Sequence, residues 1–518
     1  MYTDRQNRQK IERRRMKGLE AEETSFNEGV DFISTLPDSL LGVIISLLPD
    51  SEPVRTCVLS HRWKMVWKHA SHLSIDQSQM LKPLIQAYLC GIYLITRLEM
   101  AFNRLGADDD HEDLDVIAKA EMMINSLLDS HVGPLKSCTI RHLPESCASG
   151  KAVEWIKKLL EKNKVKQLSM EKEDIVGWGL VENLPRVLVY HGRTLALAFE
   201  IFSGFEALEL KNYYLKTSPS SDVAGQVLKT LTLKNISVKK DVLEGILSCS
   251  MCLQDLTLEN ITHEDCEMMR EIKINSPRLK FFRICEMVMN EIKVYAINLE
   301  VFEIDNVVCK PQNLTFETPK VHLLRSRCHL RNSGEYFCWV SSNESPQGSP
   351  SSFAGIFENL ATLCIDFDLK TITDTMTFFS TLKSCPKLQN LEINSRVNDD
   401  AVDYYNDQDY ADNARGYYSK KEPCECVDHQ LKTLSIRGYE GKRSEVEFVK
   451  YIITSGEVME KITIWFVDDC SWVQAAETGC LLSFWAVSPN LSITLNPGPV
   501  YMANVDDNFK TWLSTLRG

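Results

Sequence analysis

The feature that most constrains this chain is a short apolar frame, L-x-x-L-x-L or a close variant, which recurs through most of its length. Successive copies mostly begin about 20 to 28 residues apart. Each copy predicts a short strand whose alternate side chains point one way, and one such strand cannot bury its apolar row alone. The copies must therefore stack side by side. The clear ones begin at Leu228, Leu253, Leu279, Leu299, Leu360, Leu388 and Leu431, and weaker ones at Val165 and Phe205.

This spacing is typical of leucine-rich repeats and too short for all-helical repeats, which need roughly 33 residues or more. We therefore predict an α/β fold in which an irregular leucine-rich-repeat solenoid spans residues 137–397. The strands should line the inner side, and helices such as Asp241 to Cys249 and Asp374 to Cys385 should lie on the outer, convex side.

Asparagines follow four of the frames at the same offset, two residues past the last apolar position. An Asn side chain there can bond the turning backbone. In the usual leucine-rich consensus the Asn comes three residues past, so we do not expect a continuous asparagine ladder. We expect an irregular, right-handed arc instead of a regular horseshoe. The four residues are Asn212, Asn235, Asn260 and Asn306.

A different pattern occupies residues 31–76, where three short helical signals follow one another. Pro37 suits the first turn of a helix, and Pro49 ends the apolar run that follows. We interpret Leu40, Leu41, Ile44, Ile45 and Leu48 as one apolar helix face. A second helix would carry Val54, Val58 and Leu59, and a third would place Trp63 and Trp67 on one face.

These faces hold more apolar surface than a segment of this size can bury by itself, so a partner should cover the excess. LPDSLLGVIISLLP followed by VRTCVLSHRWKMVWKH closely resembles an F-box of the plant type. The resemblance implies docking to a Skp-type adaptor and, through it, to a cullin-based ubiquitin ligase. The alternative is an ordinary three-helix unit packed on the rest of the chain. By resemblance, the adaptor-binding residues are Leu36, Pro37, Ile44, Leu48, Val58, Leu59, Trp63 and Trp67.

The segment CVDHQLKTLSIRGYEGKRSEVEFVKYIITSGEVMEKITI resembles the FBD module found at the C-terminus of plant F-box proteins with leucine-rich repeats. The resemblance implies a strand from Leu431 to Ile436, a helix from Ser444 to Ser455 and a closing strand from Met459 to Trp465. We assign residues 423–467 to this FBD-like module. Residues 398–422, acidic and rich in tyrosine, predict an exposed loop, and residues 468–518 resemble nothing that we can identify.

The remaining segments argue against a membrane or nucleic-acid protein. The formal net charge of -13 repels phosphate backbones, and only residues 1–30 hold a basic cluster, which we interpret as a charged flexible tail or a weak nuclear-import signal. Residues 77–136 predict a helical linker whose apolar run, Leu84 to Thr96, is too short to span a bilayer. The 17 cysteines and the lack of a secretory stretch predict a reduced protein of the cytoplasm, the nucleus or both.

Candidate chemistry is sparse. Cys424, Cys426 and His429 lie close together, but their spacing is not a standard zinc pattern and supplies only three ligands. No nucleophile elbow, zinc-protease motif or dinucleotide fingerprint occurs. We therefore predict no catalytic residue, no metal site and no cofactor.

Two functions remain open: a substrate receptor of a cullin-type ubiquitin ligase, and a non-catalytic leucine-rich scaffold that takes no part in ubiquitination. In the first, the solenoid's concave side would hold the target protein, whose identity the sequence does not give. Positions between the apolar anchors should face that side, and we predict target contacts at Phe281, Gln254 and Lys229. The alternative is that the repeat is irregular there and that Phe281 belongs to the core. Phe282, its neighbour, already fills the expected core position.

Overall fold

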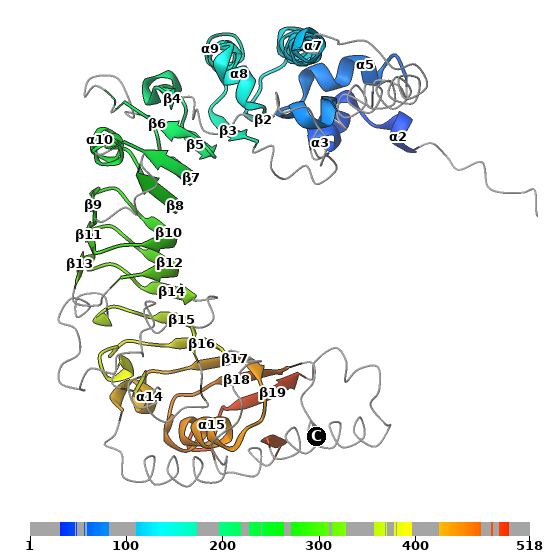
Figure 1. Cartoon of the computed structure of the whole chain (residues 1–518). Helices are drawn as coiled ribbons and strands as arrows, with labels where there is room; N and C mark the ends of the chain where they lie inside the picture. Colours follow the sequence, from blue (N-terminus) through cyan, green and yellow to red (C-terminus); the bar gives the residue numbers. More distant parts are fainter. Residues whose placement is uncertain are drawn as a thin grey trace, which may run out of the picture.

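The chain forms an arc of stacked strands with helices at its N-terminal end, as the computed structural model in Figure 1 shows. The structure describes residues 32–46, 60–81, 110–173, 196–217, 227–239, 241–263, 271–309, 313–327, 357–367, 381–395, 424–467 and 486–496, with a few isolated positions between them. The predicted second helix of the 31–76 segment, apart from Thr56, lies outside these residues, as do the apolar run 84–96 and the acidic segment 398–422.

One long parallel sheet lines the inner side of the arc, which confirms the predicted α/β class. Each strand pairs in register with the next, and two short strands, β4 (Ala196–Leu197) and β6 (Tyr214–Leu215), attach beside β7. The main path is β1 (His72–Asp76), β2 (Ser137–His142), β3 (Gln167–Lys172), β5 (Ala207–Lys211), β7 (Thr230–Val238), β8 (Asp255–His263), β10 (Phe281–Val288), β12 (Val301–Val308), β14 (Leu323–Arg327), β15 (Thr362–Asp366), β16 (Asn390–Asn394), β17 (Thr433–Tyr439), β18 (Lys461–Phe466) and β19 (Ser492–Asn496).

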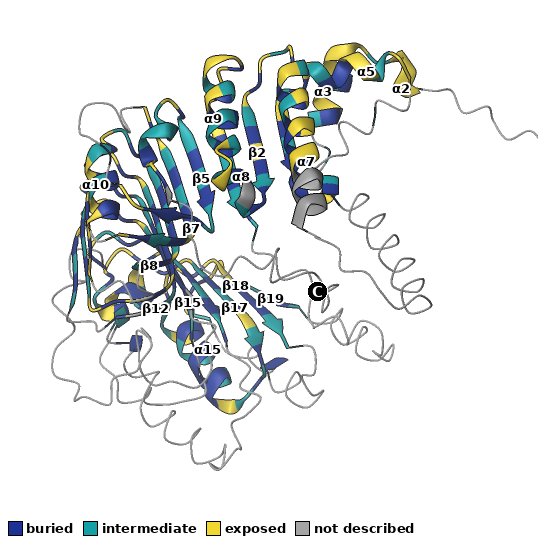
Figure 2. Cartoon of the chain, turned by 45° about the horizontal axis from the view of Figure 1, so that its top comes forward, coloured by how far each residue is buried: buried dark blue, intermediate teal, exposed yellow. Residues whose placement is uncertain are grey.

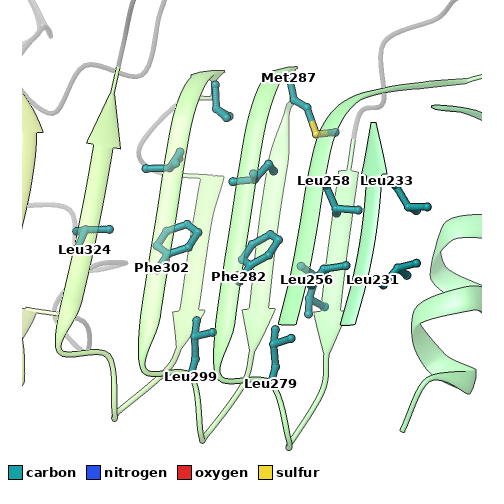
Figure 3. Close-up of a cluster of buried hydrophobic side chains, with 14 of the residues drawn as sticks. Leu231, Leu233, Leu256, Leu258, Leu279, Phe282, Met287, Leu299, Phe302 and Leu324 are labelled. Atoms are coloured by element: carbon teal, nitrogen blue, oxygen red, sulfur yellow. The ribbon is translucent and has the colours of Figure 1, made fainter. Parts of the chain in front are cut away.

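The apolar frames supply the core because their alternate side chains point away from the inner surface. Figure 3 shows one such row, which crosses five strands and is fully buried. The rings of Phe282 and Phe302 stack within it, with centroids 5.5 Å apart. Stacking therefore buries what a single strand could not. The row consists of Leu231, Leu256, Phe282, Phe302 and Leu324.

The outer layer changes along the arc (Figure 1). The predicted convex helix is present as α10 (Val242–Cys249), and α9 (Lys151–Glu161) covers the N-terminal repeats. In the middle, three strands form a second parallel sheet: β9 (Glu271–Asn275), β11 (Glu291–Tyr295) and β13 (Leu314–Glu317). The repeats advance by 25 residues from Thr230 to Asp255 but by only 20 from Cys285 to Asp305. The repeat from Asp255 to Phe281 carries the outer strand β9 although it is 26 residues long, so repeat length alone does not decide whether a helix or a strand forms the outer layer.

Left-handed backbone recurs where the strands turn outward. Asn212, Asn235 and Asn260 have φ angles of 64°, 51° and 50°. Their side chains bond in sequence: the amide of Asn235 donates to Asn212 at 3.1 Å, and that of Asn260 donates to Asn235 at 3.0 Å. A short asparagine ladder therefore exists, although we expected no continuous one, and Glu286 (φ 51°) occupies the equivalent corner of β10.

Replacing Glu286 with Asn should stabilise the protein. Asn adopts the left-handed region more readily than Glu and could extend the ladder from Asn260. We expect the free energy of unfolding to rise by about 0.5 to 1 kcal/mol, measured by urea denaturation. Glu286→Gln, which has neither advantage, is the control, and an equal gain in both variants would contradict the explanation.

The sheet continues beyond the predicted array at both ends. β1 lies within the 31–76 segment, and β17 to β19 carry the sheet through the FBD-like module and past it. The N-terminal helices are joined to the first repeats by backbone bonds: the Lys68 carbonyl accepts from Val132 N at 2.9 Å, and the Ser71 carbonyl accepts from Lys136 N at 2.7 Å. Residues such as Leu41 and Ile45 share one hydrophobic cluster with the repeats. The helices and the solenoid therefore form one continuous body.

The first repeats enclose a neutral histidine. His142 is fully buried, and its Nδ1 donates to the Leu143 carbonyl at 2.8 Å. Its Nε2 then accepts from the Tyr213 hydroxyl. Burial lowers the pKa of His142 from 6.5 to about 4, with a smaller contribution from the nearby charge of Lys172. The folded chain therefore keeps this ring uncharged at pH values where the unfolded chain would protonate it.

Acid should destabilise the fold through His142. Between pH 6.5 and about 4 the unfolded chain binds the proton and the folded chain does not, so stability falls as pH falls through this window. We expect a loss of up to about 3 kcal/mol from this group. Urea denaturation at several pH values gives the free energy of unfolding as a function of pH. Below pH 6.5 this free energy should fall less steeply with pH in His142→Gln than in the unsubstituted chain. Equal slopes would show that the ring does not control this pH dependence.

Candidate functional site

The N-terminal helices form two faces. α2 (Phe32–Thr35), α3 (Asp38–Ser46), α5 (Trp63–Val66) and the 3-10 turn η2 (Trp67–His69) follow one another, with a gap between Ser46 and Ser60 in which only Leu48 and Thr56 are described. On α3, Leu41 and Ile45 are fully buried, whereas Leu40 and Ile44 are 49% and 40% exposed. The apolar residues of α3 therefore do not form one face, as we had interpreted, because adjacent positions of a helix point about 100° apart.

Much of the surface of these helices is exposed (Figure 2), and several of the exposed residues are large and apolar. Of the fifteen large apolar side chains that are exposed among the described residues, six lie between positions 32 and 65. Exposed apolar clusters of this kind mark binding surfaces in soluble proteins. We call this set the apolar helical surface: Phe32, Ile33, Leu40, Val43, Ile44 and Met65.

Arg62 holds the elements of this surface together. Its Nε donates to Asp38 Oδ1 at 2.7 Å, and its Nη1 donates to the Ser34 carbonyl at 2.7 Å. A further bond from Nη2 reaches the Leu36 carbonyl. One guanidinium thus ties α2 and the start of α3 to the residue that precedes α5. Its planar fork suits this task, and a lysine could not make the same three bonds.

The structure describes six of the eight residues predicted to bind an adaptor. Pro37 and Ile44 are exposed, whereas Leu36, Leu48 and Trp63 are half-buried. Trp67 is only 7% exposed and packs in the chain's own core. This position differs from the direct partner contact that we predicted for it. The remaining two, Val58 and Leu59, lie outside the described residues. From the sequence, Leu40 is placed on an apolar face that a partner should cover but is not among the predicted contacts, and Phe32, Ile33, Val43, Met65 and Arg62 are not singled out.

The second candidate surface is the inner face of the long sheet. Its charged side chains pair across neighbouring strands: Arg141 bonds Asp76 at 2.8 Å and Glu171 at 3.4 Å. Lys234 lies 3.7 Å from both Glu209 and Glu259. Most charge on this N-terminal part of the face is therefore balanced locally, so these first repeats present little net charge to a partner.

The three predicted target-binding residues lie on or beside this face. Phe281 begins β10, is half-buried and points away from the core, because its neighbour Phe282 is fully buried. Gln254 precedes β8, and its carbonyl accepts from Phe281 N at 3.0 Å. Lys229 precedes β7, one strand further away, and forms an ion pair with Glu206 at 2.7 Å. The structure therefore brings Gln254 and Phe281 together and places Lys229 one strand away from them.

The cysteine and histidine cluster does not converge on one point. Cys424 and Cys426 are buried with their sulfurs 3.8 Å apart, whereas His429 is exposed and lies 3.2 Å from Glu457. Within the part of the chain that the structure describes, no group of metal-ligating side chains occurs, and no helix is long and apolar enough to cross a membrane.

The FBD-like module has the predicted order of elements. β17, which contains Gly438, leads through Gly441 to α15 (Arg443–Ser455), and β18 closes the unit. Glu445 is fully buried and accepts from the backbone N–H groups of Lys442 and Glu440 at 2.9 and 3.1 Å, which caps α15. On the inner face beside it, the Arg437 guanidinium lies 4.5 Å from the centroid of the Trp465 ring.

Comparison with known proteins relates both regions to one family. A sequence profile described as FBD matches residues 419–464, and one described as "FBD-associated F-box protein At5g56370, LRR repeats" matches residues 194–393. F-box/FBD/LRR-repeat protein At3g14710 of Arabidopsis thaliana is 21% identical over 486 residues, which cover 89% of this chain and 94% of the relative. The chain is therefore similar, over most of its length, to plant F-box proteins with leucine-rich repeats and an FBD domain.

Other members of this family are similar over different lengths. F-box protein At1g80960 of Arabidopsis thaliana is 24% identical over 464 residues, which cover 84% of each chain. F-box/LRR-repeat protein At5g02910 is 49% identical over only 49 residues. In this chain the repeat profile spans the strands from β4 to most of β16, and the FBD profile spans β17, α15 and most of β18. The FBD domain therefore continues the same sheet that the repeats build.

Proposed function

We propose that this chain is the substrate receptor of a Skp, cullin and F-box ubiquitin ligase. It docks a Skp-type adaptor through its N-terminal helices and holds a target protein on the inner face of the solenoid. It contributes no catalysis of its own and acts in the cytoplasm, the nucleus or both. The observation that carries the proposal is the apolar helical surface, exposed on helices whose sequence resembles an F-box.

Burial energetics support an obligate partner at this surface. Covering apolar area contributes about 25 cal/mol per Å², so six large exposed side chains represent several kcal/mol of available binding energy. Leu36, Pro37, Ile44, Leu48 and Trp63, with Val58 and Leu59, remain the proposed adaptor contacts, and Phe32, Ile33, Leu40, Val43 and Met65 extend them. Trp67 supports the surface from the core.

The junction with the first repeats supports the second half of the proposal. A receptor must hold its target at a fixed position relative to the enzyme that its adaptor recruits. Here the backbone bonds between the Lys68 to Ser71 segment and the Val132 to Lys136 segment join the helices to the sheet, and both share one core. The adaptor surface and the inner face are thus parts of one body.

Reconstitution tests this function directly. A tagged full-length chain should recover purified Skp-type adaptor, and it should recover a cullin only when the adaptor is present. Recovery of the cullin without adaptor would contradict the proposed order of contacts. Failure to recover either from a folded chain would favour the alternative of a scaffold outside ubiquitination.

A further inference from the structure

The inner face carries one apolar strip in an otherwise polar row. The first inward-facing position of each strand is in register across all fourteen strands of the main path. Three adjacent strands in the middle, β10, β12 and β14, place Phe281, Val301 and Leu323 there. Apart from Ala207, every other strand of the path has a polar or charged residue at this position, for example Asp255 and Thr362 on either side.

The three side chains are half-buried on the side of the sheet opposite the core. Their sequence neighbours Phe282, Phe302 and Leu324 fill the core, so the strip is not needed there. A contiguous apolar strip within a polar, solvated face is typical of a binding anchor.

A charged row runs directly beside the strip. Glu303 of β12 lies between Arg283 and Arg325 on the adjacent strands, 3.7 Å from Nη1 of Arg283 and in direct contact with Arg325. Arg283 also bonds Asp305 at 2.9 Å. The arginine side chains are 39% and 32% exposed, whereas the two carboxylates are only 8% exposed. The carboxylates thus fix the guanidiniums from below, and the groups that meet solvent are cationic hydrogen-bond donors.

The backbone of this region offers nothing to a partner. β10, β12 and β14 are each hydrogen-bonded on both sides, from β8 through to β15, so no strand can be added here. A partner must therefore be recognised through side chains. Strands about 4.8 Å apart give the strip a span of about 10 Å. Positions i and i+7 of an α-helix are separated by about the same distance.

We propose that this strip seats an amphipathic α-helix of the target protein, with its apolar stripe on Phe281, Val301 and Leu323 and an acidic flank against Arg283 and Arg325. The helix axis crosses the strands and follows the arc. This inference rests on the proposed function, since it names the kind of segment that the receptor captures.

The test is a selection with the full-length chain. The probe is a displayed library of helical peptides with leucine fixed at i, i+4 and i+7 and with random residues on both flanks. The adaptor is bound first, so that the apolar helical surface is covered. We expect enrichment of acidic residues on one flank, and we expect Phe281→Ser to weaken the selected peptides at least about tenfold. Arg325→Glu should shift the selection to a basic flank.

Val288→Ser is the matched control, because Val288 is an exposed apolar residue at the end of β10, outside the strip. Leu323→Ser repeats the test if Phe281→Ser melts at a lower temperature. Three outcomes would overturn the inference. The selected peptides could bind the Phe281→Ser chain and the unsubstituted chain equally, the unsubstituted chain could enrich a basic flank, or no peptide could be enriched. Adaptor binding is measured on the same samples, so a failure of the proposed function is seen separately.

Discussion

Replacing Leu40 and Ile44 together with Glu is expected to weaken adaptor binding at least about 100-fold. Both side chains lie on the exposed face of α3, one helical turn apart, and neither belongs to the core. Two carboxylates there would have to lose water against an apolar partner, which is costly for charged groups.

The control for this double variant is Val288→Glu with Ile297→Glu. These residues are similarly exposed and apolar, but they lie on the solenoid, far along the chain from the helices. Calorimetric titration should show normal adaptor affinity for the control and a melting temperature near that of the unsubstituted chain for both. Retained adaptor binding in a folded Leu40 and Ile44 variant would place the adaptor elsewhere.

The second large effect is expected from Gly438→Ala near the end of β17, where the register with β18 shifts. Gly438 has a φ angle of 71°, and a Cβ atom there would lie 2.6 Å from the Ser395 carbonyl oxygen of the preceding repeat. The substitution combines left-handed strain with a backbone clash. We expect a loss of about 3 kcal/mol or more from the C-terminal part of the fold.

Gly150 separates these two causes. It is also left-handed, with a φ angle of 75°, but an added Cβ would meet nothing within 4 Å. Gly150→Ala should therefore cost only about 1 to 2 kcal/mol. Hydrogen exchange of the α15 amides would report the loss in Gly438→Ala, and that of the α9 amides the loss in Gly150→Ala, because exchange resolves partial unfolding in a long chain. Equal losses in both variants would show that the Ser395 contact is unimportant.

Much of the fold could be predicted because each repeat carries its own short, recognisable sequence pattern. The leucine frames at positions such as Leu256 and Leu258 became strands with those residues buried, and the FBD order of strand, glycine turn and helix was present. The second sheet was not predicted, since the segments around Ile272 and Ile292 are too short to give a clear period. β1 was missed because its sequence, HLSID, lacks the frame.

The candidate sites were less predictable because they depend on contacts between distant residues. Leu40 and Leu41 are adjacent in a helix of ambiguous pattern, and only packing against Trp67 and its neighbours decides which one is buried. Leu323 lies in the same row as Phe281 because Phe281 pairs with Val301 and Val301 pairs with Leu323. No local sequence pattern predicts this alignment of three strands. The bonds of Arg62 connect positions 24 to 28 residues apart, which a single sequence does not reveal.

The central claim is that the N-terminal helices bind a Skp-type adaptor. The most direct measurement is calorimetric titration of purified adaptor into the full-length chain, with the mass of the complex measured by light scattering. The account predicts a one-to-one complex with a Kd below about 1 µM, lost in the Leu40 and Ile44 variant and kept in the Val288 and Ile297 control. A folded chain that forms no complex with adaptor at about 50 µM would contradict it.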